Sequence, residues 1–535
     1  MFHQVLTPVA GSLLLSFLIA AVPVALVLVL LGVLRRPAWQ ASLAGLLAGL
    51  LIATLVWDMP AGLALNAAAA GATFALWPVM WIVFNALVLY HLALRSGRFD
   101  AFREWMLVHL PNDRRIVMVV VGFCFGALLE GIAGFGSPVA ITSALLIGLG
   151  FPVLQALTIT LIFNTAPVAF GALGTPVTTL GAVTQLSDTA LGAMIGRQLP
   201  FLALLLPFYT VAVYSGGRSL RAVWPVLLVA GGSFGLAQFV TSNFLDYALT
   251  DVLSSLGSLV ATVAFLKIWR PAADPEYALA VAPAAGASTA STVPPWQGWA
   301  PWAVLSVVVI FWTTARLNLI GQIPVAWPGL HNAVYITAYD KPYAAIWNFQ
   351  PLATGTAILV AGFIATPLVA LGPRDWLGAV RDAVRQVRLA VLTVALIIAL
   401  AYLMNYSGMT YTLGIAVAAA GFLFPLLSAF LGWVAVFLSG SDTSGNALFG
   451  NLPVVAARQL DLDPLLMAAT NSSGGVMGKM ISPQNISTGA AVTELKGREG
   501  EILASTFKHS IILTLLLGLL VMLQQHFLQW MIPPH

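Results

Sequence analysis

The chain has 535 residues, of which 60% are hydrophobic and only 8% are charged. This composition excludes a soluble globular protein, which carries about 25% charged residues, and it excludes a disordered chain, which is poor in apolar residues. Cys124 is the only cysteine, so the chain cannot form an internal disulfide. The net charge of +4 does not indicate a nucleic-acid partner, because the basic residues lie at the ends of apolar runs and not in one patch with aromatic residues.

Apolar runs of membrane-spanning length recur along the chain and predict an all-α polytopic membrane protein with about twelve spans. The runs are 12–34, 41–57, 67–94, 153–190, 195–215, 222–243, 247–267, 299–315, 351–372, 389–405, 465–490 and 509–531. Two further runs, 116–150 and 428–457, are broken near their middles by Gly, Ser and Pro. We predict that each forms a re-entrant hairpin, since irregular backbone is tolerated at depth where it lines a cavity.

The basic residues predict the orientation. If both hairpins are re-entrant, one side of the membrane receives eighteen of the 23 Lys and Arg residues and the other side receives three, while Arg197 and Lys479 fall within spans. The side rich in Lys and Arg is cytoplasmic by the positive-inside rule, so both termini are predicted to be periplasmic. A hairpin that crossed the membrane would move every later loop to the opposite side and remove this bias.

Four segments between the spans have distinctive compositions. Residues 98–110 and 374–388 mix charged with apolar residues and are predicted to be amphipathic helices on the cytoplasmic face. Residues 271–298 are rich in Ala, Pro, Ser and Thr, which is typical of a flexible linker between two halves. Residues 316–350 contain two Trp and three Tyr. We interpret them as an interfacial aromatic belt, with a substrate lid as the alternative.

The two halves share a motif. The pattern Asn-[Thr/Ser]-x5-Gly-x3-[Thr/Ser]-Pro begins at Asn164 in the first half and at Asn471 in the second. The predicted orientation makes the matched spans run in opposite directions, so the halves are predicted to be inverted repeats. We expect a first repeat over 1–215 with a hairpin at 116–150 and a broken helix at 153–190, connecting helices and a cytoplasmic linker over 216–298, and a second repeat over 299–535 with a hairpin at 428–457 and a broken helix at 465–490.

Inverted repeats with interrupted helices are typical of secondary transporters, in which one site near the midplane is exposed to either side in turn. A channel needs no such arrangement. The sequence has no HExxH or GxSxG motif and no metal-ligand spacing of His and Cys. We therefore expect a transporter that is not an enzyme and that has no metal site and no cofactor.

The hairpin tips and helix breaks supply the polar residues of the predicted site. Glycines and a proline open the first tip, so that backbone N–H groups can face an anion, and the second tip adds hydroxyls and an amide. The alternative interpretation is that these small residues only permit close helix packing. The candidate substrate-binding residues are Gly134, Gly136, Ser137, Asn164, Thr165, Thr175, Ser441, Thr443, Ser444, Asn446, Asn471, Ser472, Ser473, Lys479, Gln484 and Asn485.

Few charged residues fall at membrane depth. Glu130 and Asp442 are the only carboxylates predicted there, where a charge costs at least about 2.5–3.5 kcal/mol, and both are candidate proton carriers. For Asp442 the alternative is a fixed carboxylate bonded to hydroxyls. Lys479 stands where the first repeat has Ala172, and it could contact the substrate, neutralise a carboxylate or snorkel to the interface. Asp251 is predicted to be interfacial.

The segments around these residues resemble the bacterial lactate permease family. The resemblance rests on LLEGIAGFGSPVAI at 128–141, GSDTSGNALFG at 440–450 and ATNSSGGVMGKMISPQNI at 469–486, and it covers essentially the whole chain. It implies an inner-membrane symporter of L-lactate, and often of D-lactate and glycolate, with protons. It also implies the architecture of the larger ion-transporter superfamily, with inverted repeats and paired hairpins.

The sequence thus predicts a proton-coupled symporter of small 2-hydroxy monocarboxylates that works by alternating access. Its expected partners are lactate or glycolate, the proton, membrane lipid and, as one option, a second copy of the chain. The residues alone indicate a coupled carrier of a small anionic solute, and lactate comes from the resemblance. Sodium coupling is the alternative, with Asn, Ser and Thr side chains and carbonyls at the breaks binding the ion.

Overall fold

The computed structural model describes residues 1–34, 36–98, 110–132, 137–272, 274–279, 295–491, 493–495 and 498–534. Within these ranges, ten helices are long and apolar enough to cross a membrane, or up to eleven if the bent pair Val153–Phe163 and Val168–Thr184 forms one span. The chain is therefore an all-α polytopic membrane protein, as its composition predicts.

The full spans are fewer than the apolar runs suggest. The run at 351–372 forms only α16 (Thr354–Leu368), and the run at 465–490 is divided into α22 (Pro464–Lys479) and α23 (Pro483–Ala491). A proline lacks the amide donor that a helix interior needs, so Pro483 begins a new helix instead of continuing the old one. Counting apolar runs overestimates spans where such residues interrupt them.

The remaining elements follow in chain order. The first part of the chain contains β1 (Phe2–His3), α1 (Leu13–Leu28), η1 (Val29–Val33), α2 (Ala38–Leu55), α3 (Ala61–Phe74), η2 (Ala75–Met80), α4 (Trp81–Arg95), α6 (Arg114–Val117), η3 (Met118–Phe125), α7 (Gly126–Ile132), α8 (Ser137–Gly148), α9 (Val153–Phe163), η4 (Val168–Phe170), α10 (Gly171–Thr184), α11 (Asp188–Ile195), α12 (Leu199–Ser215), α13 (Leu220–Phe244), η5 (Tyr247–Leu249), α14 (Thr250–Ile268) and η6 (Pro275–Tyr277). The second part contains α15 (Pro295–Thr314), η7 (Leu317–Leu319), β2 (Ile323–Ala326), β3 (Val334–Ile336), β4 (Lys341–Pro342), β5 (Ile346–Phe349), α17 (Pro373–Ser407), α18 (Met409–Val417), η8 (Ala418–Leu423), α19 (Phe424–Ser439), α20 (Asp442–Phe449), α21 (Asn451–Gln459), α24 (Glu499–His526) and η9 (Gln529–Met531).

The chain turns between α19 and α20 at the predicted tip of the second hairpin. Gly440 has a φ of 72°, a left-handed conformation that glycine adopts without a Cβ clash. A Cβ atom at this position would lie 2.6 Å from Gln484 Oε1, so the tip packs directly against α23. Ser441 then caps α20, because its hydroxyl accepts a hydrogen bond from the Ser444 amide at 3.4 Å.

The first predicted hairpin corresponds to α7 and α8, which pack against each other. Its tip, with the predicted site residues Gly134 and Gly136, lies outside the described residues, as does the side chain of Ser137.

The helix after the first hairpin is broken. The axes of Val153–Phe163 and Val168–Thr184 differ by 62°. Ala172, Leu173 and Gly174 all have positive φ, a conformation that costs a non-glycine residue about 1–2 kcal/mol. Packing holds this strained turn, since a Cβ atom on Gly174 would lie 2.8 Å from the Tyr247 ring. Irregular backbone buried within a membrane protein marks a position where a site can form.

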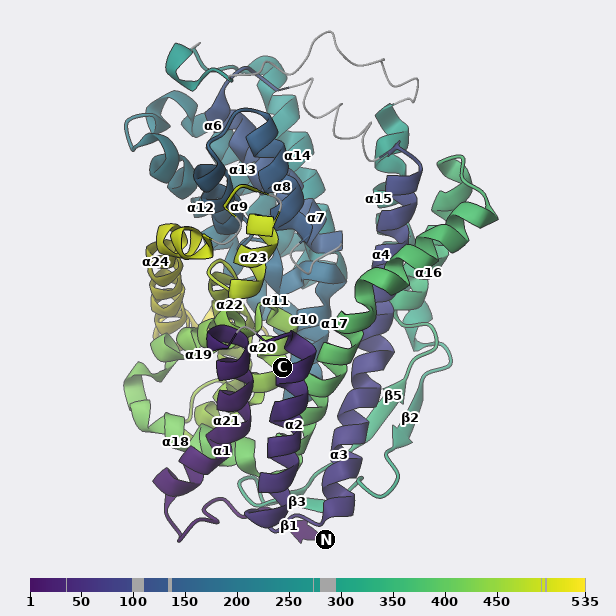
Figure 1. Cartoon of the computed structure of the whole chain (residues 1–535), viewed down its shortest axis with the longest axis vertical. Helices are drawn as coiled ribbons and strands as arrows, with labels where there is room; N and C mark the ends of the chain where they lie inside the picture. Colours follow the sequence, from purple (N-terminus) through teal and green to yellow (C-terminus); the bar gives the residue numbers. More distant parts are fainter. Residues whose placement is uncertain are drawn as a thin grey trace.

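The expectation of a separate amphipathic helix at 374–388 is wrong, because these residues form the first part of the long helix α17. It runs without interruption over 35 residues and crosses the molecule obliquely (Figure 1). No proline follows Pro373 in this stretch, so nothing ends the helix between its charged and apolar parts. Its length of about 52 Å at 1.5 Å per residue exceeds the apolar core of a bilayer. Most of the other predicted amphipathic segment, 98–110, lies outside the described residues.

Two small sheets, which the sequence did not predict, lie together with the N-terminus at one end of the molecule (Figure 1). Strand β3 pairs in parallel with β1 and antiparallel with β4, while β2 and β5 form an antiparallel pair. The parallel pairing joins the N-terminus to the segment 316–350. The N-terminus therefore lies on the same side of the molecule as this segment.

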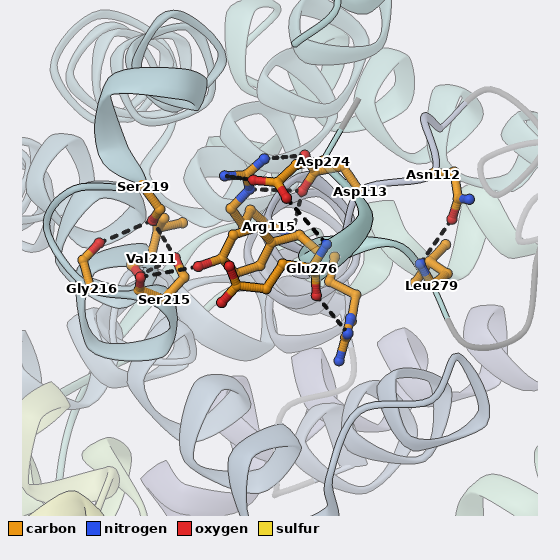
Figure 2. Close-up of polar contacts among 12 residues, drawn as sticks. Asn112, Asp113, Arg115, Val211, Ser215, Gly216, Ser219, Asp274, Glu276 and Leu279 are labelled. Carbon is orange, nitrogen blue, oxygen red and sulfur yellow. Dashed lines mark hydrogen bonds and ion pairs between the residues drawn. The ribbon is translucent and has the colours of Figure 1, made fainter. Parts of the chain in front are cut away.

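The start of the predicted linker is anchored to the first hairpin (Figure 2). Arg115, at the beginning of the hairpin, is buried and pairs with Asp113 at 2.6 Å and with Asp274 at 3.8 Å. The Leu279 amide donates to Asn112 Oδ1 at 2.9 Å. These contacts hold residues 274–279 against the hairpin, whereas 280–294 lie outside the described residues.

Close packing of α19 against α22 generates a prediction. A Cβ atom on Gly432 would lie 1.8 Å from the Asn471 carbonyl oxygen, so Gly432→Ala must push the two backbones apart. We expect a loss of at least about 1–3 kcal/mol in the free energy of unfolding, measured as a lower melting temperature in detergent. Gly62→Ala is the matched control, because a Cβ atom there meets nothing within 4 Å. Equal melting temperatures for the two variants would contradict this account of the packing.

Candidate functional site

A small cavity of about 30 Å³ lies where the two predicted hairpins and the two helix breaks meet, close to the centre of the molecule. Its walls come from α7, η4, α10, the second hairpin, α22 and α23. The lining residues are Glu130, Val168, Gly171, Ala172, Thr175, Pro176, Gly440, Ser441, Asp442, Thr443, Lys479 and Gln484. A cavity of this size holds one or two waters, so the hairpins must separate before it can admit a larger solute.

The cavity contains a buried ion pair between the two halves of the chain. The Lys479 ammonium at the end of α22 pairs with Glu130 Oε1 on α7, and their exposed fractions are 5% and 2%. Asn164 Nδ2 donates to Glu130 Oε2 at 3.0 Å. A Cβ atom on Gly171 would lie 3.0 Å from Glu130 Oε1, so the helix break closes over the carboxylate. Of the sequence hypotheses for Lys479, neutralisation of Glu130 is the one observed, and snorkelling is wrong.

Asp442 is held differently. Its Oδ2 accepts hydrogen bonds from the Ser472 hydroxyl at 2.5 Å and from Asn446 Nδ2 at 3.3 Å. It is the first residue of α20, where the helix dipole stabilises a negative charge. Its Oδ1 has no hydrogen-bond partner among the described residues. This geometry favours the alternative reading of Asp442 as a fixed carboxylate.

Three predicted asparagines hold the breaks together and do not line the small cavity. Asn446 Nδ2 donates to the Pro176 carbonyl at 3.2 Å, and Asn471 Nδ2 donates to Asn446 Oδ1 at 2.9 Å. Asn485 Nδ2 donates to the Lys479 carbonyl at 3.2 Å. The asparagines therefore join α10, α20, α22 and α23 around the ion pair.

Other predicted residues contact the backbone or the scaffold. The Thr165 hydroxyl donates to the Ile162 carbonyl at 2.7 Å, and the Ser473 hydroxyl donates to Gln198 at 2.7 Å. Ser444 contributes its amide to the cap of α20. None of the three lines the small cavity. Among the predicted hydroxyl residues, Thr175, Ser441 and Thr443 do. The hydroxyl oxygens of Thr175 and Thr443 are 3.4 Å apart.

Sequence reasoning misplaced Asp251. It was expected at the interface, but it has 0% exposure in the first turn of α14. Neither of its carboxylate oxygens has a hydrogen-bond partner among the described residues. A Cβ atom on Gly131 would lie 2.7 Å from Asp251 Cβ, so the end of α7 packs against it. Asp251 lies near the end of an apolar run, which predicts exposure. The sequence of the run does not show that α7 packs against this position.

The apolar part of the cavity wall was also missed, although the sequence held a signal for it. Ala172 and Lys479 occupy matched positions in the two repeats, and both line the small cavity. Gly171 is the glycine of the shared motif in the first half of the chain. The match of Ala172 to Lys479 is visible in the sequence, but the structure is needed to show that both positions line one cavity.

A second, larger cavity of about 430 Å³ lies further along α10, beside the two small sheets. Thr178 and Gly181 of α10 line it, as do three aromatic residues of the segment 316–350, namely Trp327, Tyr343 and Trp347. These side chains line a cavity, which the aromatic-belt interpretation does not predict. Because Thr175 and Thr178 are one turn apart on α10, the two cavities are neighbours. We refer to them as the small cavity and the large cavity.

Within the part of the chain that the structure describes, no group of three or more His, Cys, Asp or Glu side chains could hold a metal ion. The charged residues of the small cavity can bind and neutralise charge.

Comparisons with known proteins agree on one family. The family model described as L-lactate permease matches residues 16–528. The chain is 41% identical to glycolate permease GlcA of Escherichia coli, over 96% of this chain and 97% of that protein. It is 40% identical to the L-lactate permease of Bacillus subtilis, over 99% of both chains. Among solved structures, the YdaH transporter of Alcanivorax borkumensis has a TM-score of 0.47 at 14% identity, covering 88% of this chain and 89% of that chain.

The ion pair generates a stability prediction. Lys479→Met leaves the Glu130 carboxylate buried without a cation, which we expect to lower the free energy of unfolding by about 3–5 kcal/mol. Adding Glu130→Gln removes the orphaned charge and should recover most of the loss. Thermal unfolding of both single variants and the double variant measures this coupling. If the losses in the free energy of unfolding of the two single variants simply add in the double variant, the two side chains do not depend on each other.

Proposed function

The chain belongs to the L-lactate permease family, and we propose that it couples substrate to a proton by making the substrate carboxylate and Glu130 compete for Lys479. It is a secondary transporter of 2-hydroxy monocarboxylates and not an enzyme. It is a multi-pass membrane protein, and its bacterial relatives point to the plasma membrane. The competition for Lys479 and the proton are our proposal.

The buried ion pair carries this proposal. The walls of the small cavity hold one cation, Lys479, and two carboxylates, Glu130 and Asp442. An entering substrate anion would add a further negative charge, and two like charges 4 Å apart repel by about 4 kcal/mol even at an effective dielectric constant of 20. The substrate can therefore take Lys479 only when Glu130 becomes neutral. Uptake of one proton by Glu130 achieves this, and one proton then travels with each anion.

The same balance explains why half-loaded states would not reorient. A protonated Glu130 without substrate leaves Lys479 unpaired, and a substrate beside an ionised Glu130 leaves an excess anion. Each leaves a buried charge uncompensated, which costs about 3–5 kcal/mol. In the empty carrier, closed by its ion pair, and in the carrier loaded with both ligands, Lys479 is balanced by one anion, and Asp442 carries the same charge in both. A complete cycle between the two arrangements therefore moves no net charge.

The hydroxyls in the cavity wall suit a 2-hydroxy acid. Lys479 would take the carboxylate, while Thr175, Ser441 and Thr443 offer donors and acceptors to the 2-hydroxyl. Val168 and Ala172 provide an apolar surface for a short side chain. Two relatives are a glycolate permease and an L-lactate permease, and glycolate and lactate both carry a hydroxyl beside the carboxylate.

We extend the proposal to the topology. Two re-entrant hairpins and two broken helices would form inverted repeats over 1–215 and 299–535, joined by 216–298, with both termini periplasmic. The matched Ala172 and Lys479 line one cavity, as expected for repeats that share a site. The pairing of β1 with β3 places the N-terminus beside the predicted external segment.

Sodium coupling is a second candidate because one observation favours it. Three buried side-chain oxygens near the second hairpin and break accept no hydrogen bond from the described residues: Asp442 Oδ1, Asn471 Oδ1 and Asn485 Oδ1. Carboxylate and amide oxygens are suitable ligands for a hard cation. A sodium ion bound near them would balance the substrate charge in place of a proton.

Proteoliposomes separate the two ions. We expect lactate to accumulate when the outside is acidified in sodium-free buffer, because the proton gradient supplies the driving force. A sodium gradient at equal pH on both sides should drive no accumulation. Lactate uptake that ignores the pH gradient but requires sodium would overturn proton coupling and favour the second candidate.

Glu130→Gln tests the carboxylate that we assign to the proton. Glutamine imitates the neutral acid, so the loaded carrier can still reorient, but the empty carrier keeps an unpaired Lys479. We expect uphill lactate uptake to fall by about 100-fold or more, in line with an uncompensated buried charge, while lactate exchange stays within a few-fold of the original rate. Asp442→Asn is the comparison, because loss of a fixed carboxylate should lower both. Equal loss of uptake and exchange in Glu130→Gln would indicate a binding or structural role.

A further inference from the structure

Asp251 is a buried carboxylate that the proposed cycle does not use. It has 0% exposure, and neither carboxylate oxygen has a hydrogen-bond partner among the described residues. An ionised carboxylate without a partner is expensive to bury, and unpaired acids inside membrane proteins commonly mark proton pathways. Its position therefore calls for a functional explanation.

One side of Asp251 faces the ion pair. The carboxylate follows the start of α14, and a Cβ atom on Gly131 would lie 2.7 Å from Asp251 Cβ and 3.3 Å from the Val252 amide nitrogen. Gly131 is the residue after Glu130. The charged groups that act on Asp251 are Glu130 from α7 and Lys479 from α22. Glycine at 131 thus allows the backbone of α14 at Asp251 to pack closely against the turn that carries Glu130.

The other side of Asp251 leads toward the large cavity. Tyr247 precedes it by four residues, about one helical turn, and lines that cavity together with Thr178 and Asp188. The Tyr247 hydroxyl lies 3.1 Å from the Thr178 hydroxyl and donates to Asp188 Oδ2 at 3.3 Å. Tyr247, whose hydroxyl can pass a proton, thus lines the large cavity, and Asp251 lies about one helical turn further along the chain. Asp251 itself lines neither cavity.

We propose that Asp251 exchanges protons between Glu130 and the large cavity along a side route that bypasses the substrate. This inference rests on the proton coupling proposed above. When the substrate carboxylate takes Lys479, the O–H bond of Asp251 breaks and its proton passes across a bridging water, so that an O–H bond forms on Glu130. Asp251, now ionised, regains a proton from water in the large cavity by way of the Tyr247 hydroxyl. The net change is one proton taken from that cavity for each anion bound.

A side route has a physical advantage. The substrate approaches Glu130 through the small cavity, where it would block access of water to the carboxylate. Asp251 packs against Gly131, the residue next to Glu130, and lies outside the small cavity, so in this proposal Glu130 can be protonated while the substrate already occupies its site. Binding of the anion and uptake of the proton can then occur in either order.

Asp251→Asn in the full-length protein tests this role, with Ser255→Ala as the matched control. Ser255 is buried one turn further along α14, and its hydroxyl only contacts its own helix at the Val252 carbonyl. We expect Asp251→Asn to slow lactate uptake driven by a pH gradient by about 10-fold or more, as loss of a positioned proton-transfer group does. Lactate exchange should stay within about two-fold, and Ser255→Ala should change neither.

The outcomes decide between the explanations. Gradient-driven uptake by Asp251→Asn at the original rate, or equal losses of uptake and exchange in folded protein, would overturn the relay. If Asp251→Asn does not fold, Tyr247→Phe removes only the hydroxyl at the cavity end, and unchanged gradient-driven uptake would then overturn it. The unsubstituted protein is assayed alongside. If lactate uptake by the unsubstituted protein does not depend on the pH gradient, the proposed proton coupling is wrong. If the unsubstituted protein depends on the gradient and the variants show the same gradient-driven uptake, only the relay is wrong.

Discussion

The ion pair between Glu130 and Lys479 is the interaction on which the site depends. It joins α7 to α22 across 349 residues of sequence, and removing two charges from water costs several kcal/mol each before their attraction repays it. The surrounding structure fits this need: Asn164 donates to the second carboxylate oxygen, and Gly171 lets the helix break close over it. A purely structural contact could be made by apolar side chains at less cost, which is why the pair points to transport.

Charge balance then links the parts of the protein. Among the described residues that line the small cavity, Lys479 is the only cation, so an anionic substrate and Glu130 must share it in turn. The small cavity has a volume of only about 30 Å³, the large cavity lies one turn along α10, and Asp251 packs against the residue next to Glu130. Substrate and proton can therefore reach one pair of charges from different directions. In the strained backbone at 172–174, Ala172 lines the small cavity and Gly174 packs against Tyr247, which lines the large cavity.

Much of the site was predictable because charge is scarce in this chain. Glu130, Asp442 and Lys479 stood out as charged residues within apolar runs, and the structure brings all three to one cavity. The features that sequence missed depend on tertiary contacts. Asp251 looked interfacial because its apolar run begins nearby, and only the packing of Gly131 shows that it is enclosed. The segment 374–388 looked like a separate helix because its composition changes, but nothing in the backbone ends α17 there.

Proton uptake on binding tests the central claim most directly. Lactate is added to the purified protein in weakly buffered detergent solution at neutral pH, and the protons taken from solution are counted against the lactate bound. The competition for Lys479 predicts about one proton for each lactate, and no uptake when Glu130→Gln binds lactate. Binding of lactate by the unsubstituted protein without proton uptake would contradict the account.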